Sequence, residues 1–215
     1  MKGRLILTAF FCIVLCTGCE KFQDKDTFEI INKEDIVTEN YSGKEIKYHK
    51  LSAGNLLNGY KNLSDEEANK LAQSIKNNPH ETKPFYYIGI AEDIFPFDKE
   101  VAAVTFLYGQ YRSAQDANCC KDETSFDFIN NLPYFAPETS KYIQKISKEE
   151  YKKIFEKVLE LDDKYSERIS PIWACYNGQD AVTKDKIETY PKEEWAKKRQ
   201  EVRIDYIFQA KNLSR

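Results

Sequence analysis

The chain has little of what most catalytic and metal sites require. Its 215 residues include only two histidines, and no segment matches a Gly-x-Ser-x-Gly elbow, a His-Glu-x-x-His helix, paired Cys-x-x-Cys motifs or a glycine-rich phosphate loop. Glycine and proline are also scarce, with 8 and 7 residues, while 41% of residues are hydrophobic. This composition excludes collagen-like, low-complexity and strongly disordered chains. We therefore expect a globular body with no catalytic, metal or cofactor site that the sequence can identify.

Long apolar runs are also absent, with one exception at residues 5–17, so a polytopic membrane protein is excluded. Lys2 and Arg4 precede this run, and the small residues Thr17 and Gly18 follow it before Cys19. Thirteen apolar positions make a helix of about 20 Å, which is too short for a hydrocarbon core of about 30 Å. The pattern predicts a cleaved signal peptide over residues 1–18.

The end of this leader, Leu15-Cys16-Thr17-Gly18-Cys19, resembles the lipobox of bacterial lipoproteins, although Cys16 stands where leucine is usual. The resemblance covers only the first nineteen residues. It implies that Cys19 carries diacylglycerol, that the chain is cut before this cysteine, and that the body faces the periplasm or the cell surface. Glu20 follows the cysteine, and the absence of aspartate there slightly favours the outer membrane. The charged residues 20–27 are then expected to form a tether, and 28–215 a single globular domain.

The charge of the mature chain is unevenly distributed. Residues 19–150 hold 23 acidic and 16 basic residues, whereas 151–215 hold 12 acidic and 14 basic residues. An acidic front opposes binding to nucleic acid and attracts a basic protein partner through long-range electrostatics. The same charges also serve simply to keep a small secreted domain in solution.

Three cysteines remain in the mature body after Cys19: Cys119, Cys120 and Cys175. Their odd number requires at least one unpaired thiol or an intermolecular bond, and an export compartment favours disulfides. We expect one disulfide from Cys175 to either Cys119 or Cys120. A strained vicinal bond between the two neighbours is the less favoured alternative. His49 and His80 are the only imidazoles that a reactive thiol would have as a base.

The hydrophobic pattern predicts strands and helices without regular β-α-β alternation. Strands are expected near 28–31, 45–51, 84–91, 172–176, 179–183 and 202–208, with Asn177-Gly178 as a hairpin turn. Helices are expected from Ser64 and from Ser147, which both begin capping boxes, and in a short segment containing Trp195. Residues 100–117 favour a buried helix over a strand, and 118–140 have no regular pattern. The prediction is an α+β fold, a single compact domain with a small antiparallel sheet packed by several helices; a mostly helical body is the alternative.

Two features remain as candidate binding elements. The proline-bounded segment 125–135 contains Phe126, Phe128, Tyr134 and Phe135, which can form a recognition surface or simply pack beneath the loop. Asp162 and Asp163 lie near the expected end of a helix, where acidic groups are electrostatically unfavourable, and this makes them a candidate cation or partner site.

These observations favour a membrane-tethered lipoprotein of the cell envelope that binds a protein partner and catalyses no reaction. An inhibitor or immunity-type protein and an assembly factor are two versions of this hypothesis. The alternative is a periplasmic hydrolase that uses acidic residues. Lipidated Cys19 is the expected contact with the membrane, the partner is expected to be basic, and nucleic acid is not expected as a ligand.

Overall fold

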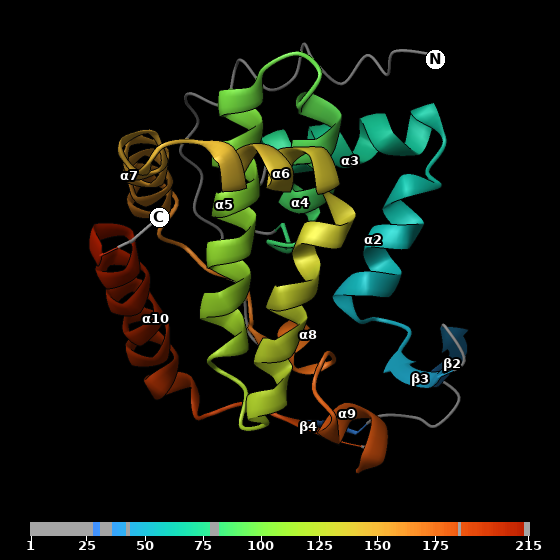
Figure 1. Ribbon diagram of the computed structural model, residues 1–215. Coiled ribbons are helices and arrows are strands. Elements are labelled where there is room, and N and C mark those ends of the chain that lie inside the picture. Colours follow the sequence, from blue (N-terminus) through green and yellow to red (C-terminus); the bar gives the residue numbers. More distant parts are fainter. Residues whose placement is uncertain (1–27, 31–35, 42–43, 78–81, 185, 213–215) are drawn as a thin grey trace.

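The computed structural model describes residues 28–30, 36–41, 44–77, 82–184 and 186–212, and within these the chain is mainly helical (Figure 1). The leader, Cys19, the tether and His80 lie outside the described residues. The helices are α2 (Ala53–Lys61), α3 (Asp65–Asn77), α4 (Tyr86–Ile94), α5 (Lys99–Ala117), the 3₁₀ helix η2 (Glu123–Phe135), α6 (Pro137–Lys145), α7 (Lys148–Lys164), α8 (Ile172–Cys175), α9 (Asp180–Thr183) and α10 (Lys192–Asn212). The strands are β1 (Phe28–Ile30), β2 (Ile36–Tyr41), β3 (Lys44–His49) and β4 (Lys186–Glu188).

The strands of the described residues form two separate antiparallel pairs. β1 pairs with β4, with Phe28 opposite Glu188, and β2 pairs with β3, with Ile36 opposite His49. The buried apolar side chains come mostly from the helices. The predicted α+β fold with a small antiparallel sheet packed by several helices is therefore wrong, because segments that we expected as strands are helices.

The first of these segments is α4, predicted as a strand over 84–91. Every residue from Phe85 to Ala91 except Tyr86 is buried, so the segment has one nearly continuous apolar run. A helix that is buried on all sides loses its 3.6-residue period and cannot be told from a buried strand by pattern alone. α4 packs lengthwise against α5, and this packing decides its conformation.

α10 replaces the predicted strand at 202–208 for a different reason. Its side chains at Trp195, Val202 and Ala210 are buried, whereas Ile204 and Phe208 are exposed on the opposite side. A helix with apolar residues on both faces shows apolar–polar alternation over a short window. This alternation led to the prediction of a half-buried strand.

The predicted hairpin at 172–183 is also wrong. Ile172–Cys175 and Asp180–Thr183 form the single-turn helices α8 and α9, and Asn177-Gly178 joins them. The Asn177 side chain is used to hold another element: its Oδ1 accepts a 2.8 Å hydrogen bond from the Ala53 N–H at the start of α2. The turn therefore positions helices and forms no strand pair.

The helices with capping signals are confirmed. Ser64 and Glu67 exchange hydrogen bonds at the start of α3, and the Ser147 hydroxyl accepts from the Glu150 N–H at the start of α7. The ambiguous segment 100–117 is the helix α5, whose N-terminus is capped by Asp98. α5 is the central helix of the described body and packs against α4, α6, α7, α8, α10 and η2.

None of the helices in the described residues is both long and apolar enough to span a membrane.

Candidate binding surface

The 3₁₀ helix η2 presents the most exposed aromatic side chain of the described body. Of the four aromatic residues predicted as a partner surface, Tyr134 is 78% exposed and Phe126 is also exposed, whereas Phe128 is buried and Phe135 is partly buried. The segment runs beside α5, in yellow-green in Figure 1. Tyr134 and Phe126 thus fit the prediction of a recognition surface, whereas Phe128 and Phe135 fit the alternative in which the rings pack beneath the loop.

Exposed residues of η2 occur along its whole length, between buried ones. We call this set the η2 ridge. It comprises Glu123, Phe126, Asp127, Asn130, Asn131 and Tyr134.

The buried side chains of η2 hold the ridge against the core. Phe128 makes an edge-to-face contact with Trp173 at 5.9 Å between ring centroids, and Ile129 and Leu132 are buried nearby. A 3₁₀ helix of thirteen residues is uncommon because its hydrogen bonds are poorly aligned. The buried side chains therefore supply much of what stabilises the segment.

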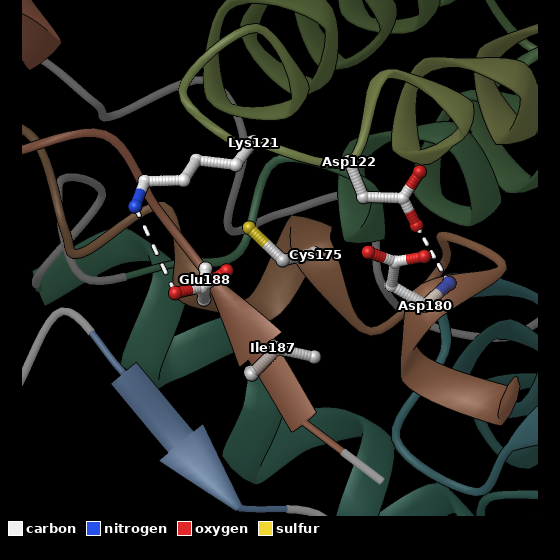
Figure 2. A pocket seen from close by; sticks show the side chains of 6 residues that line it. All are labelled: Lys121, Asp122, Cys175, Asp180, Ile187 and Glu188. Atoms are coloured by element: carbon white, nitrogen blue, oxygen red, sulfur yellow. Dashed lines mark hydrogen bonds and ion pairs between the residues drawn. The ribbon is translucent and has the colours of Figure 1, made fainter. Parts of the chain in front are cut away.

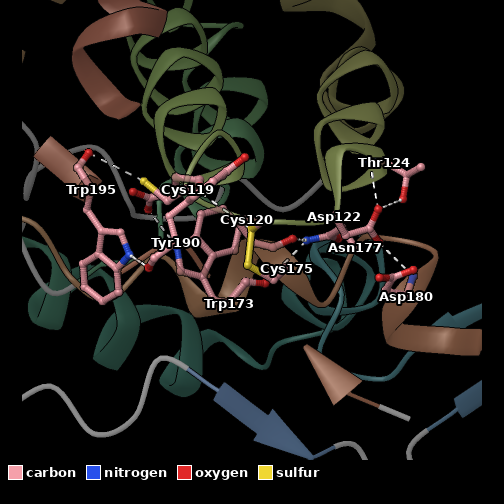
Figure 3. Close-up of a disulfide and its surroundings, with 12 residues drawn as sticks. Cys119, Cys120, Asp122, Thr124, Trp173, Cys175, Asn177, Asp180, Tyr190 and Trp195 are labelled. Carbon is pink, nitrogen blue, oxygen red and sulfur yellow. Dashed lines mark hydrogen bonds between the residues drawn. A yellow bond between two sulfur atoms is a disulfide. The ribbon is translucent and has the colours of Figure 1, made fainter. Parts of the chain in front are cut away.

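A disulfide ties the beginning of η2 to α8 (Figure 3). Cys120 is bonded to Cys175, with 5.5 Å between their Cα atoms. Of the two partners that the sequence left open for Cys175, the structure thus joins Cys120, and Cys119 has a free, buried thiol. A bridge between residues 55 positions apart restricts the unfolded chain and fixes the start of the ridge.

Asp122 adds a second connection at the same place. One carboxylate oxygen accepts hydrogen bonds from the backbone N–H and the hydroxyl of Thr124, and the other accepts a 2.7 Å bond from the Asp180 N–H. The Thr124 hydroxyl also accepts from the Gln179 N–H. Together these bonds join the first turn of η2 to the first turn of α9.

Gly178 permits this close approach. A Cβ atom at Gly178 would lie 2.2 Å from Asp122 Oδ2 and 2.4 Å from Ser125 Oγ. No side chain fits at these distances, so glycine is required by space. Gly178, which predicted a hairpin turn together with Asn177, therefore serves to let the chain pack closely against Asp122 and Ser125.

A small cavity lies beside the disulfide (Figure 2). Its volume is about 10 Å³, enough for about one water molecule. It is lined by Lys121, Asp122, Cys175, Asp180, Ile187 and Glu188. Lys121 Nζ lies 3.7 Å from the Glu188 carboxylate, and Asp122 accepts a hydrogen bond from the backbone of α9. These polar side chains therefore hold the surrounding elements together.

The far end of η2 is fixed by α4 and α2. Glu92 accepts hydrogen bonds from the N–H groups of Glu138 and Thr139 at the start of α6, which follows η2 directly. The Lys61 ammonium lies 5.5 Å from the centre of the Phe135 ring. Both ends of the ridge are thus attached to other elements of the body.

Charge distinguishes the ridge from the rest of the surface. Residues 122–140 contain four acidic side chains and no lysine, arginine or histidine. Glu123 and Asp127 are exposed on the ridge, and Asp122 is used internally. The ridge therefore combines two exposed aromatic rings, two exposed carboxylates and two amides.

Asp162 and Asp163, the candidate cation or partner site, have different roles in the structure. Asp162 is buried, where it forms ion pairs with Arg112, Arg168 and Arg203 and accepts a hydrogen bond from the Tyr111 hydroxyl. Asp163 is exposed and pairs with Arg203. Three guanidinium groups explain an acidic residue at a helix C-terminus, so neither acid is available as a cation ligand.

A second buried acid, Asp116, holds α10 in the same manner. Its carboxylate accepts from the Trp173 indole N–H at 2.9 Å and from Arg199, which lies on α10. Sequence reasoning missed both ion-pair sites, since Arg199 lies 83 residues from Asp116, and Arg112 and Arg203 lie 50 and 41 residues from Asp162. The one local signal was the unfavourable place of Asp162 in its helix.

The free thiol of Cys119 is enclosed between α5 and α10. Its Sγ contacts the carbonyl oxygens of Gln115 at 3.4 Å and Trp195 at 3.8 Å. Burial raises the pKa of this thiol to about 12, which opposes the reactive thiolate form. The cysteine is thus suited to packing and unsuited to nucleophilic chemistry.

Within the described residues, no group of three or more histidine, cysteine, aspartate or glutamate side chains is arranged to hold a metal ion. Comparison of the chain with protein-family models, curated proteins and solved structures finds no match.

Proposed function

We propose that this protein is a lipid-anchored protein of the cell envelope that binds a basic protein partner through the η2 ridge and catalyses no reaction. The observation that carries the proposal is the ridge itself: exposed aromatic rings and carboxylates on a segment that is attached at both ends. Inhibition of a basic toxin or wall-degrading enzyme, and assistance in assembly, are two activities that such a surface serves.

The chemistry of the ridge supports a protein partner. Tyrosine is enriched among the residues that dominate binding energy, because it buries a large area at a small cost in conformational entropy. Tyr134 and Phe126 supply this area, and Glu123 and Asp127 supply charge at the rim. Since residues 122–140 carry no positive side chain, the ridge attracts a basic partner and repels an acidic one.

The attachment of the ridge supports the same proposal. A surface that is already ordered loses little conformational entropy when it binds. The disulfide, the Asp122 hydrogen bonds and the Glu92 hydrogen bonds to α6 order both ends of η2 before any partner arrives. The lipobox-like residues before Cys19 supply the anchoring part of the proposal.

Site-specific photo-crosslinking tests the binding surface. A benzophenone side chain at Asn131, placed in the full-length protein in cells, is expected to capture a basic protein. Phe126→Ala with Tyr134→Ala should reduce this capture at least about 30-fold, because each aromatic hot spot contributes on the order of 1–2 kcal/mol. Phe97→Ala is the matched control, since Phe97 is an exposed aromatic residue outside the ridge. Undiminished capture by the double variant, or capture of an acidic partner, would contradict the proposal.

Metabolic labelling with a fatty-acid analogue tests the anchor separately. The wild-type chain and Cys119→Ala are expected to carry the label, and Cys19→Ala is expected to lose it. Label that persists in Cys19→Ala would refute lipidation at this residue without affecting the binding surface.

A further inference from the structure

The spacing of the η2 ridge residues acquires a meaning from the type of helix that carries them. In a 3₁₀ helix, side chains three positions apart eclipse each other, because each turn has three residues and rises about 6 Å. The first such pair on the ridge is Glu123 and Phe126. A carboxylate and an aromatic ring therefore leave the first turn of η2 on a common side, about 6 Å apart along the axis.

The two acids next to Phe126 differ from the other acids of this region. Of the four acidic residues in 122–140, Asp122 accepts hydrogen bonds from Thr124 and α9, and Glu138 pairs with Lys141. Glu123 and Asp127 are exposed, and within the described residues neither carboxylate forms a hydrogen bond or an ion pair. The body thus leaves unpaired the two carboxylates that flank its exposed ring.

Two free carboxylates beside a ring favour one cationic side chain over the other. The planar guanidinium of arginine stacks on an aromatic ring and can donate two parallel hydrogen bonds to a carboxylate. The ammonium of lysine is a compact, strongly hydrated charge and lacks this planar geometry. The combination therefore matches arginine.

We infer that Glu123, Phe126 and Asp127, which we call the arginine site, bind an arginine side chain of the basic partner. The guanidinium stacks on the Phe126 ring and is hydrogen-bonded to Glu123, and Asp127 adds negative charge beside it. This inference rests on the proposed function, because it names the residue type by which the η2 ridge recognises its partner. Tyr134, about 16 Å further along the helix, contacts a different part of that partner.

The backbone of the arginine site is already ordered. Ser125 is fully buried, and Phe128 packs against Trp173, so residues on both sides of Phe126 are fixed in the core. The disulfide at Cys120 holds the chain just before the site. A preorganised site loses little conformational entropy on binding, and this favours recognition of a single side chain.

Two peptides of equal length and charge test the selectivity. Each carries a fluorescein label and three copies of either Gly-Ser-Arg or Gly-Ser-Lys, and fluorescence anisotropy measures their binding to the full-length protein in mild detergent. The arginine peptide is expected to bind about 3- to 10-fold more tightly than the lysine peptide, because only arginine combines stacking with a bidentate hydrogen bond.

Variants of the arginine site locate this preference. Phe126→Leu removes the ring but keeps an apolar side chain, so the preference should disappear, whereas Phe126→Tyr should keep it. Glu123→Gln should weaken binding of the arginine peptide about 3- to 10-fold. Glu156→Gln changes an exposed glutamate of α7, outside the ridge, and should leave both peptides unaffected. Thermal unfolding checks that each variant is folded, and the exposed Glu123→Gln decides the question if Phe126→Leu is not.

Equal affinity for the two peptides overturns the inference, as does a preference for arginine that persists in folded Phe126→Leu and in Glu123→Gln. An arginine peptide that does not bind at about 1 mM overturns it as well. Photo-crosslinking at Asn131 separates this result from the proposed function. Capture of a basic protein together with equal peptide affinities refutes the arginine site alone, whereas the absence of both capture and peptide binding refutes both proposals.

Discussion

The η2 ridge and the side of α10 with exposed Ile204 and Phe208, which we call the α10 face, both expose aromatic side chains, yet the body supports them in different ways. The ridge depends on a covalent bond, Cys120–Cys175, and on hydrogen bonds to Asp122. The α10 face depends on ion pairs to buried Asp116 and Asp162. The neighbours Cys119 and Cys120 mark the boundary: the first contacts Trp195 of α10, and the second is bonded to α8 beneath the ridge.

The charge patterns of the two surfaces differ as well. The ridge has carboxylates and no positive side chain, so it cannot be complementary to a copy of itself. On α10, by contrast, Glu201, which lies three residues before Ile204, is used within the body: it pairs with Lys198 and accepts a hydrogen bond from Asn118. The two supports also differ in kind, so each can be weakened separately.

The largest effect on the support of one surface alone is expected from Asp162→Asn, which acts on α10. Removing this charge leaves Arg112, Arg168 and Arg203 without their shared carboxylate, and breaking a buried ion pair costs about 3–5 kcal/mol. Urea unfolding should report this loss, and limited proteolysis should cleave α10 first.

Asp163→Asn is the matched control for this change. The Asp163 side chain is 68% exposed and pairs with Arg203 Nη2. Exposed ion pairs contribute about 0–1 kcal/mol, so the variant should unfold almost as the wild type does. Equal losses in the two variants would show that burial of Asp162 is not what supports α10.

The next largest effect is expected from replacing both Cys120 and Cys175 with serine. A disulfide typically contributes about 2–4 kcal/mol, chiefly by restricting the unfolded chain. The variant should lose this stability and should also protect the amide protons of η2 less well from hydrogen exchange, while α10 stays protected. Reductant should shift the wild type to the same unfolding midpoint and leave the variant unchanged; a shift in the variant would be inconsistent with a single structural disulfide.

Gly178→Ala should weaken the ridge by a smaller amount. The added methyl group would overlap Asp122 and Ser125, and overpacking typically costs about 1–3 kcal/mol. Gly59→Ala is the control, because a Cβ atom there meets nothing within 4 Å and alanine is favoured over glycine in a helix by about 1 kcal/mol. Thermal unfolding should therefore move in opposite directions for the two glycines, and a stabilised Gly178→Ala would contradict the close approach described for the Asp122 carboxylate.

Local signals in the sequence predicted part of this structure. The capping boxes at Ser64 and Ser147 locate α3 and α7, because a cap depends on residues only three positions apart. The aromatic segment 125–135 was identified as a candidate surface, and the structure exposes Tyr134 and Phe126 and buries Phe128. Phe128 is buried against Trp173, which lies 45 residues later in the chain. The local pattern therefore does not reveal which rings point outward.

The errors have the same origin. α4 lacks a helical period because neighbouring helices cover it on all sides, and α10 carries apolar residues on two faces. In both cases contacts distant in sequence, or a surface left exposed, decide what the local pattern means. The alternation in α10 that predicted a strand is produced by the same Ile204 and Phe208 that form the α10 face.

The smallest effect on stability is expected at alkaline pH and comes from the Cys119 thiol, which contacts α10. Burial raises the pKa of its thiol from 9.0 to about 12, so the folded protein keeps the proton in a range where the unfolded chain releases it. The stabilisation that this thiol contributes is therefore complete below pH 9 and is lost as the pH rises toward 12, by up to about 1.4 kcal/mol for each pH unit. Urea unfolding at pH 8 and pH 10 should show a difference of about 1 kcal/mol that is smaller in Cys119→Ala, which lacks this buried thiol. The disulfide beneath the ridge does not titrate, so alkaline pH should loosen α10 before η2. Identical pH dependence in the wild type and the alanine variant would show that the Cys119 thiol is not protected by α10.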